Sequence, residues 1–190
     1  DHIISSERHP GNTGLHGQGL ALDPTANNVT IRNSVFRNCH CTAAINPQDS
    51  DGHQNIFVYN NLFYSDNPSR YQPSGLFRNT GEDKLNNSRF YNNTVYNWSA
   101  GGGNANIFSN GAGSNLEGYN NVFVNSVVNS WDYFSHHHNA YYKNEWNETG
   151  SVSLSYIPFT NANNPVGADG IPFTADDGLI PPTNSPLCGA

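Results

Sequence analysis

An eleven-residue pattern that recurs four times constrains the fold of this chain more than any other feature. The pattern is a short alternating run, a polar pair at its sixth and seventh positions, and a second alternating run. It occupies residues 28–38, 55–65, 87–97 and 115–125, and a degenerate fifth copy covers residues 138–142. The sixth positions are Asn33, Asn60, Asn92 and Asn120, which are 27, 32 and 28 residues apart. Repetition at such intervals predicts a solenoid.

A second set of short apolar runs lies between the copies of this pattern. These runs are residues 19–22, 43–46, 75–78, 105–108 and 132–135. Each repeat therefore contains two or three short strands, and period-two alternation directs the apolar side chains of each strand inward. No stretch of the chain forms an amphipathic helical pattern of three turns. The sequence predicts an all-β, parallel β-helix of about five coils.

Asparagine at the sixth position has a physical explanation. A sharp corner between two parallel sheets needs a residue that tolerates a left-handed backbone, and asparagine tolerates it better than other residues with a side chain. Stacked from coil to coil, such side chains can hydrogen-bond to one another and to backbone groups. We therefore predict a structural asparagine ladder through Asn33, Asn60, Asn92 and Asn120.

The composition is typical of a β protein rich in tight turns. The 190 residues include 31 asparagines and 18 glycines, whereas only 12% are charged. A mean hydropathy of −0.63 and the lack of an apolar run of about 20 residues argue against a membrane span. A formal net charge of −7 argues against nucleic acid, whose binders need a basic surface. The length fits one domain, with coils over residues 1–166 and a closing segment over residues 167–190.

The repeat also carries a resemblance to a known group of proteins. Its consensus, x-N-x-x-[VIF]-x-N-N-x-[FV]-x-N, resembles the asparagine-ladder coils of the right-handed parallel β-helix superfamily, the pectate-lyase-like fold. The segment GADGIPFTADDGLIPPTNSPLCGA, residues 167–190, resembles the closing segment of bacterial secreted β-helix proteins. Together the likenesses cover most of residues 16–190. They imply a right-handed helix and leave the activity open, since the superfamily contains lyases, hydrolases, epimerases, adhesins and non-catalytic modules.

Two groups of residues are partial matches to the chemistry of enzymes with this fold. Lyases of the superfamily use a Lys or Arg base and a cation that neutralises the uronate carboxylate. The basic cluster here consists of Arg70, Arg78, Lys84 and Arg89, in a long coil with an inserted loop. Hydrolases of the superfamily pair Asp residues, and Asp49, Asp51 and His53 in PQDSDGH come closest, without the surrounding motifs. Loop charges and a simple turn are the ordinary explanations of these groups, so the sequence shows no clear active site.

The segment DGIPFTADDG, residues 169–178, is the best candidate for a metal site. It concentrates Asp169, Asp176 and Asp177, and carboxylate oxygens suit a hard cation such as Ca²⁺. The alternative is a closing turn in which the Asp side chains bond their own backbone. The run His136–His137–His138 is a weaker candidate, because neighbouring residues on a strand face opposite sides and at most two imidazoles would converge on one metal.

Several residues bear on the environment of the chain. Sequons at Asn28, Asn86, Asn97 and Asn147 are candidate glycosylation sites, and a fifth sequon at Asn92 coincides with the predicted ladder. The three cysteines, Cys39, Cys41 and Cys188, cannot all pair internally. Either one of the first two pairs with Cys188, or Cys39 and Cys41 are small buried residues. The chain starts at Asp1 without a signal sequence, and we expect an excised portion of a longer secreted precursor, located outside the cell or on its surface.

Three hypotheses about function follow. The favoured one is a non-catalytic module of a cell-surface, sheath or fibre protein that stacks end to end and carries or contacts glycans, because solenoid ends are rows of unpaired backbone groups. The second is a polysaccharide lyase or glycoside hydrolase acting on acidic polysaccharide. The third is a carbohydrate-binding module in which Tyr59, Tyr91 and Tyr119, at one repeat position, stack on sugar rings. The sequence does not decide whether that position faces solvent or the core.

Overall fold

The computed structural model describes most of the repeat and the closing segment. The described residues are 2–5, 19–22, 26–39, 45–47, 52–66, 76–78, 85–98, 108–109, 113–126, 128, 131, 134–143 and 146–188. Within them all regular structure is β-strand, and the strands pair in parallel. The prediction of an all-β fold with parallel strands is confirmed. Over the same residues there is no helix that could span a bilayer.

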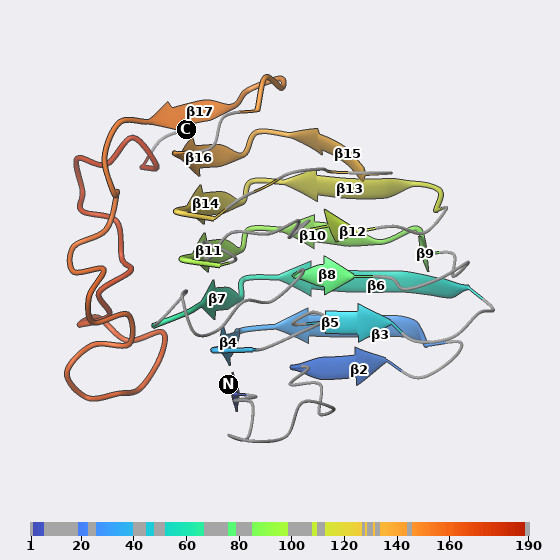
Figure 1. The fold of residues 1–190 in the computed structure, drawn as a ribbon, viewed down its shortest axis with the longest axis horizontal. Coiled ribbons are helices and arrows are strands. Elements are labelled where there is room, and N and C mark those ends of the chain that lie inside the picture. Colours follow the sequence, from blue (N-terminus) through green and yellow to red (C-terminus); the bar gives the residue numbers. More distant parts are fainter. Residues whose placement is uncertain are drawn as a thin grey trace, which may run out of the picture.

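The strands form three sheets (Figure 1). The seven-stranded sheet has the order β1 (His2–Ser5), β4 (Ser34–Arg37), β7 (Leu62–Tyr64), β11 (Thr94–Tyr96), β14 (Val122–Val124), β16 (Ala140–Tyr142) and β17 (Val152–Leu154). The six-stranded sheet runs β15 (Phe134–His137), β13 (Leu116–Tyr119), β10 (Arg89–Tyr91), β6 (His53–Tyr59) and β3 (Asn27–Arg32), and β9 (Leu85–Asn86) also pairs with β6. The four-stranded sheet runs β12 (Phe108–Ser109), β8 (Phe77–Arg78), β5 (Ile45–Pro47) and β2 (Leu20–Leu22).

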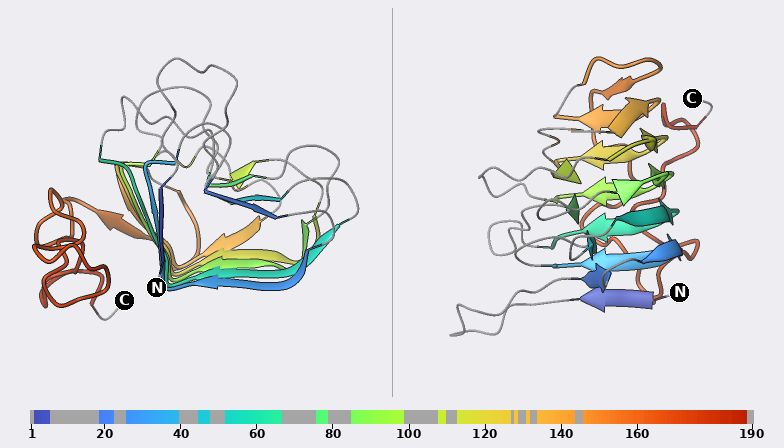
Figure 2. Two further views of the ribbon diagram at one scale, coloured as in Figure 1. Left: turned by 90° about the horizontal axis from the view of Figure 1, so that it is seen from below. Right: turned by 90° about the vertical axis from the view of Figure 1, so that its right-hand side faces the viewer.

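The chain passes from sheet to sheet and advances by one strand at each return. The successive pairs β3–β4, β6–β7, β10–β11, β13–β14 and β15–β16 are called layers 1 to 5 here. Seen along the stack, the strands of each sheet lie over one another (Figure 2). Because each strand hydrogen-bonds to its equivalents in the layers above and below, the arrangement is compatible with a parallel β-helix.

Residues with a left-handed backbone form the corners. At the sixth repeat position, Asn33, Asn60, Asn92, Asn120 and His138 have φ between 50° and 55°. The first and eleventh positions also turn this way: Asn28, Asn55, Asn87, Asn115, Asn38, Asn97, Asn125 and Lys143 have φ between 49° and 63°. Asparagine recurs at these outer positions too, so the sequence carried a signal for three corners in layers 1, 3 and 4, although only the middle corner was predicted. Asparagine is favoured here because its short polar side chain tolerates the left-handed region.

The hydrogen-bonded ladder lies one residue beyond the predicted one. Asn33, Asn60, Asn92 and Asn120 are exposed, whereas the buried residues that follow in layers 2 to 5 are Asn61, Asn93, Asn121 and Asn139. The Nδ2 atoms of Asn61, Asn93 and Asn121 donate to Oδ1 of the next asparagine at 3.1, 3.1 and 3.0 Å. The placement at the sixth position is therefore corrected: the corner residue turns its own side chain to solvent and its successor inward.

Asn93 shows why the ladder contributes to stability. Its Oδ1 accepts from the backbone N–H and from Nδ2 of Asn61. Its Nδ2 donates to Oδ1 of Asn121 and to the carbonyl oxygen of Val58. Both donors and both lone pairs of the amide are thus used. The ladder satisfies backbone groups that the turn removes from the strand pairing, and such groups are costly to bury unpaired.

Two different residues end the ladder. In layer 1 the equivalent position is Ser34, whose N–H donates to Asn61 Oδ1 at 3.1 Å. Beyond layer 5, Glu148 Oε1 accepts from the N–H of Asn139 at 2.8 Å. A carboxylate suits this end because it supplies acceptors only, in the position where the next asparagine Oδ1 would lie.

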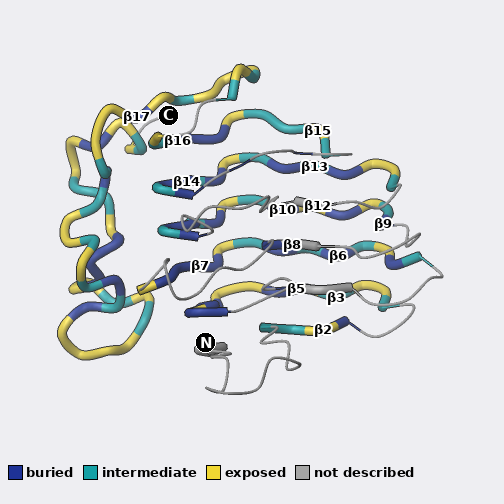
Figure 3. Tube along the Cα trace, in the orientation of Figure 1, coloured by how far each residue is buried: buried dark blue, intermediate teal, exposed yellow. Residues whose placement is uncertain are grey.

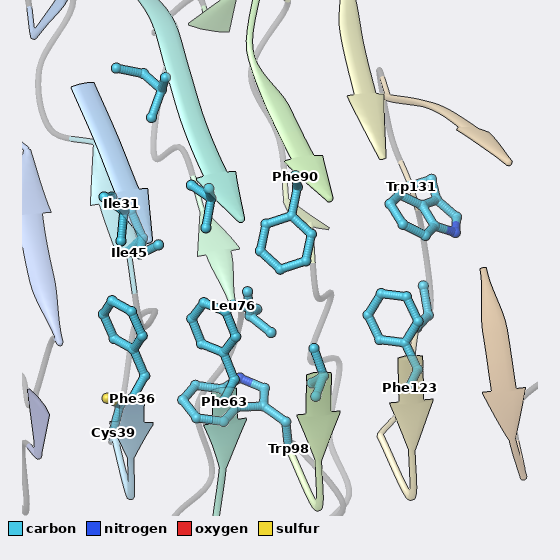
Figure 4. Packing of buried hydrophobic residues seen from close by; sticks show 14 of the residues in the cluster. Ile31, Phe36, Cys39, Ile45, Phe63, Leu76, Phe90, Trp98, Phe123 and Trp131 are labelled. Atoms are coloured by element: carbon cyan, nitrogen blue, oxygen red, sulfur yellow. The ribbon is translucent and has the colours of Figure 1, made fainter. Parts of the chain in front are cut away.

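Aromatic residues stack in register between the sheets. Phe36, Phe63, Val95, Phe123 and Tyr141 occupy one inward position of the seven-stranded sheet. Phe36 stacks on Phe63 at 4.7 Å between ring centroids, and Phe123 stacks on Tyr141 at 5.4 Å. Figure 4 shows Ile31 and Phe90 packing against this column from the opposite sheet, with Cys39 buried beside Phe36. Like residues stack because the register brings each repeat position directly above itself.

A segment without strands, residues 155–188, covers the outer face of the seven-stranded sheet (Figures 1 and 3). We call it the strap. It forms a second apolar cluster with outward residues of the sheet, in which Tyr96 meets Phe159 edge-on at 6.0 Å. Gly178 lets two turns of the strap approach, because a Cβ there would lie 2.0 Å from the carbonyl oxygen of Asn161. The sheet is thus buried on both faces, and the last strand ends at Leu154, before the expected start of the closing segment.

Replacing Asn93 by Ala tests the corrected ladder. We expect the free energy of unfolding to fall by about 3–5 kcal/mol, because buried groups of Asn61, Val58 and Asn121 lose partners. The neighbouring Asn92→Gly is the matched control. It keeps the left-handed corner and should change stability by less than about 1 kcal/mol. Urea unfolding measures both variants, and equal effects would contradict the placement of the ladder.

Candidate functional site

The exposed face of the six-stranded sheet carries a row of stacked rings. Tyr59, Tyr91, Tyr119 and His137 occupy equivalent positions in β6, β10, β13 and β15 and are partly exposed. Their successive ring centroids are 4.8, 5.1 and 5.2 Å apart, with interplanar angles of 16°, 10° and 6°. We call these four residues the aromatic row. The structure thereby decides the open question about the tyrosines, which face outward while Val58 and Phe90 face the core.

Stacking limits what the aromatic row can bind. Tyr91 and Tyr119 have a neighbouring ring against each face, so only their edges reach solvent. A sugar that stacks on an aromatic side chain needs a free ring face. In the middle of the row, a ligand could therefore reach only the phenol hydroxyls and the ring edges. The ring faces are covered by neighbouring rings and cannot stack on a sugar.

Two charged side chains beside the row form an ion pair with each other. Arg89 Nε donates to Glu117 Oε2 at 2.6 Å, with the two side chains 45% and 35% exposed. An exposed pair of this kind contributes up to about 1 kcal/mol to stability. Arg89 belonged to the basic cluster predicted from the sequence, and the ion pair with Glu117 neutralises its charge on this face.

A cluster around one buried carboxylate, Glu148, lies at the end of the ladder next to layer 5, and the sequence analysis did not identify it. Glu148, whose side chain is 2% exposed, accepts from Tyr141 Oη at 3.1 Å and contacts His136 Nδ1. Trp131 Nε1 donates to the same phenol at 3.2 Å. Burial, followed by the nearby Glu148 carboxylate, raises the pKa of Tyr141 and keeps it neutral. The enclosure gives a polymeric substrate no access to Glu148, so the cluster serves to end the ladder.

Most of the predicted catalytic residues lie outside the part of the chain that the structure describes, so their grouping stays a prediction. Asp49, Asp51, Arg70 and Lys84 lie outside the described residues, as does the side chain of Arg78 in β8. His53 begins β6 with 0% exposure, and among the described residues neither of its ring nitrogens has a hydrogen-bond partner. Its imidazole is therefore shielded from solvent.

The acidic loop of the strap bonds its own backbone. Asp176 Oδ2 accepts from the N–H groups of Ala168 and Asp169, and Asp177 Oδ2 accepts from those of Phe173 and Thr174. Hydrogen bonds from Thr174 and from this backbone lower the pKa of Asp176. In the described ranges no three His, Cys, Asp or Glu side chains are grouped as metal ligands. The geometry corresponds to the alternative of a closing turn, and calcium binding by Asp169, Asp176 and Asp177 stays a prediction.

The candidate glycosylation sites differ in their surroundings. Asn28 and Asn147 are exposed. Asn86 and Asn97 are partly buried, and their Oδ1 atoms accept hydrogen bonds from Ser114 and Asn125 in the next layer. Asn28 Oδ1 likewise accepts from Asn55. Asn147 is thus the sequon that a glycan would occupy with least disturbance of the layers.

Cys39 is buried and Cys188 exposed, whereas Cys41 lies outside the described residues.

Comparison with known proteins found no matching family model, no matching curated protein and no matching solved structure. The site is therefore interpreted from its own geometry.

Tyr91 allows a test of the aromatic row by pH. Burial, then the neighbouring Tyr59 and Tyr119, raises its pKa above the ordinary value of 10.0. A raised pKa in the folded state means that the stabilising contribution is complete below pH 10 and is lost as the pH rises through the folded value. We expect Tyr91→Phe to retain the stacking, to unfold like the wild type at pH 7, and to lose less stability above pH 10. Thermal unfolding across this pH range measures the difference, and parallel curves would exclude the contribution of Tyr91.

Proposed function

We propose that this chain is a non-catalytic, extracellular module of right-handed parallel β-helix type with about five coils, a stiff segment of a cell-surface, sheath or fibre protein. The observation that carries the proposal is the aromatic row, in which the ring faces are used for contacts between layers. An exposed surface built in this way stabilises the stack of layers, and on it Arg89 and Glu117 are paired with each other.

The strap and the ladder support the same function. Strap residues Leu179 and Leu187 pack with outward side chains of several layers. These contacts oppose movement of one layer relative to the next. The ladder uses all four hydrogen-bonding positions of Asn93 and ends at Glu148. A solenoid held by interfaces between successive layers gains stiffness from each such row.

The proposal includes contacts with glycans and with further copies of the chain. Exposed Asn147 is its preferred glycan attachment site. The edge strands β1, β2 and β3 lie at the same end of the three sheets. Edge strands present backbone groups that can pair with another chain. At the opposite end of the stack, Glu148 already occupies the end of the ladder. We therefore propose that copies pair through the end that contains β3.

Electron microscopy with intact mass measurement on native protein tests this function. We expect stacks or paired rods, a mass above the 20.8 kDa of the polypeptide, and no cleavage of pectin or alginate. Depolymerisation of a uronate polymer that is abolished by Asp51→Ala or Arg78→Ala would overturn the non-catalytic role in favour of a lyase or hydrolase.

Unchanged thermal stability in EDTA would remove calcium from the proposal, because an ion bound only to the folded state must stabilise it.

A second candidate function is glycan binding along the edge of the aromatic row. The observation that favours it is a line of partly exposed phenols spaced about 5 Å apart, flanked by the polar pair Arg89 and Glu117. Such hydroxyls can donate to and accept from the hydroxyls of an extended polysaccharide.

Calorimetric titration with neutral and acidic polysaccharides tests this candidate. Tyr91→Phe should weaken binding on the order of fivefold to tenfold, since it removes a hydroxyl contact worth about 1 kcal/mol and keeps the ring. Tyr156→Phe is the control, because Tyr156 is 46% exposed but lies on the strap. Equal loss in both variants, or binding to neither polymer, would exclude the row as a glycan site.

A further inference from the structure

The last layer departs from the repeat at two consecutive positions. In layers 2 to 4 the end of the strand and the corner are Tyr–Asn, whereas layer 5 has His137 and His138. The two Nδ1 atoms lie 2.8 Å apart, and the ring planes are nearly perpendicular, at 88°. Both side chains are accessible at the surface. The sequence had suggested that neighbouring imidazoles on a strand diverge, but the left-handed backbone of His138, with φ of 55°, brings this pair together.

Neighbouring groups hold both rings in place. Tyr119 lies parallel to His137, with 5.2 Å between the ring centroids. His138 donates its backbone N–H to Thr149 O at 2.8 Å. Its ring occupies space that Gly150 leaves free, because a Cβ on Gly150 would lie 2.2 Å from Cδ2 and 2.6 Å from Nε2 of His138. The Nε2 edge therefore faces Gly150, and Nδ1 is directed toward His137.

We propose that His137 and His138 form a bidentate site for a divalent transition metal, with Cu²⁺ preferred over Ni²⁺ and Ni²⁺ over Zn²⁺. Two metal–imidazole bonds of about 2.0–2.1 Å at a right angle place the nitrogens roughly 2.8–3.0 Å apart, as in tetragonal sites. Tetrahedral zinc would require roughly 3.3–3.4 Å between them. The observed 2.8 Å fits the right angle. Both Nδ1 atoms must be unprotonated to bind the metal, so the ring that donates its Nδ1 proton in the metal-free pair changes to the tautomer protonated on Nε2.

The surroundings leave room for the rest of the coordination shell. The contact between the two Nδ1 atoms is exposed, so solvent water can complete the coordination of the ion. The formal net charge of −7 also favours a cation over an anion. The site is independent of the proposed structural role of the module.

The repeat itself supplies matched variants for the test. His137→Tyr restores the residue found in layers 2 to 4, and His138→Asn restores the corner asparagine. Both variants should fold, and thermal unfolding in EDTA checks this. Titration of the wild type with Cu²⁺, followed by electron paramagnetic resonance and calorimetry, should show one site with two nitrogen ligands. Each variant should weaken that site on the order of tenfold or more.

The outcomes distinguish the site from copper bound elsewhere. If wild type and both folded variants bind Cu²⁺ with the same affinity and spectrum, the pair does not hold the metal and the proposal is wrong. Zinc binding at least as tight as copper binding would contradict the right-angle geometry. Loss of the two-nitrogen spectrum in both variants, with unchanged unfolding temperature in EDTA, is the expected result.

Discussion

The buried row of amide hydrogen bonds from Ser34 to Glu148 is the interaction on which the rest of the structure depends. Each layer turns sharply between two sheets, and at the turn backbone N–H and C=O groups lose their strand partners. The side chain of a buried asparagine in the next layer hydrogen-bonds to these groups. The backbone N–H of that asparagine in turn donates to the asparagine of the layer after it. Because Asn93 uses both donors and both lone pairs, a slip of register by one residue would leave all four unpaired. The ladder therefore fixes the register.

Fixed register explains the stacking of like residues in the core and on the exposed face of the six-stranded sheet. Phe36 lies against Phe63 within the core, and Tyr59 lies against Tyr91 on the exposed face. The same regularity also places apolar side chains on the outer face of the seven-stranded sheet. These side chains would be exposed to water without a covering segment. The strap supplies this cover through residues such as Phe159 and Leu179. One constraint at the corner thus accounts for the core, the aromatic row and the need for the strap.

The proposed metal site arises where the repetition stops. Within the stack, each residue contacts the equivalent residue of the next layer. The last layer lacks a following layer, so different residues must satisfy its groups. Layer 5 does so twice: Glu148 ends the ladder with a carboxylate, and His137 with His138 replaces the Tyr–Asn corner. The first change contributes to stability, and the second places two imidazole nitrogens where a metal can bind. Neither change could be assigned a role without the geometry of the preceding layers.

The sequence by itself determined the repeat, the parallel strands and the left-handed corners, because these follow from local periodicity and from the conformational preference of asparagine. It did not determine which asparagine of each pair points inward, since Asn92 and Asn93 are chemically identical and the turn between them decides. It also left the face of Tyr59 and the role of Glu148 open. Only the tertiary structure decided these, because the asparagine and tyrosine contacts join residues about thirty positions apart in sequence and those of Glu148 depend on how the last turn folds back. For the same reason the strap's position over the seven-stranded sheet is a property of the folded chain.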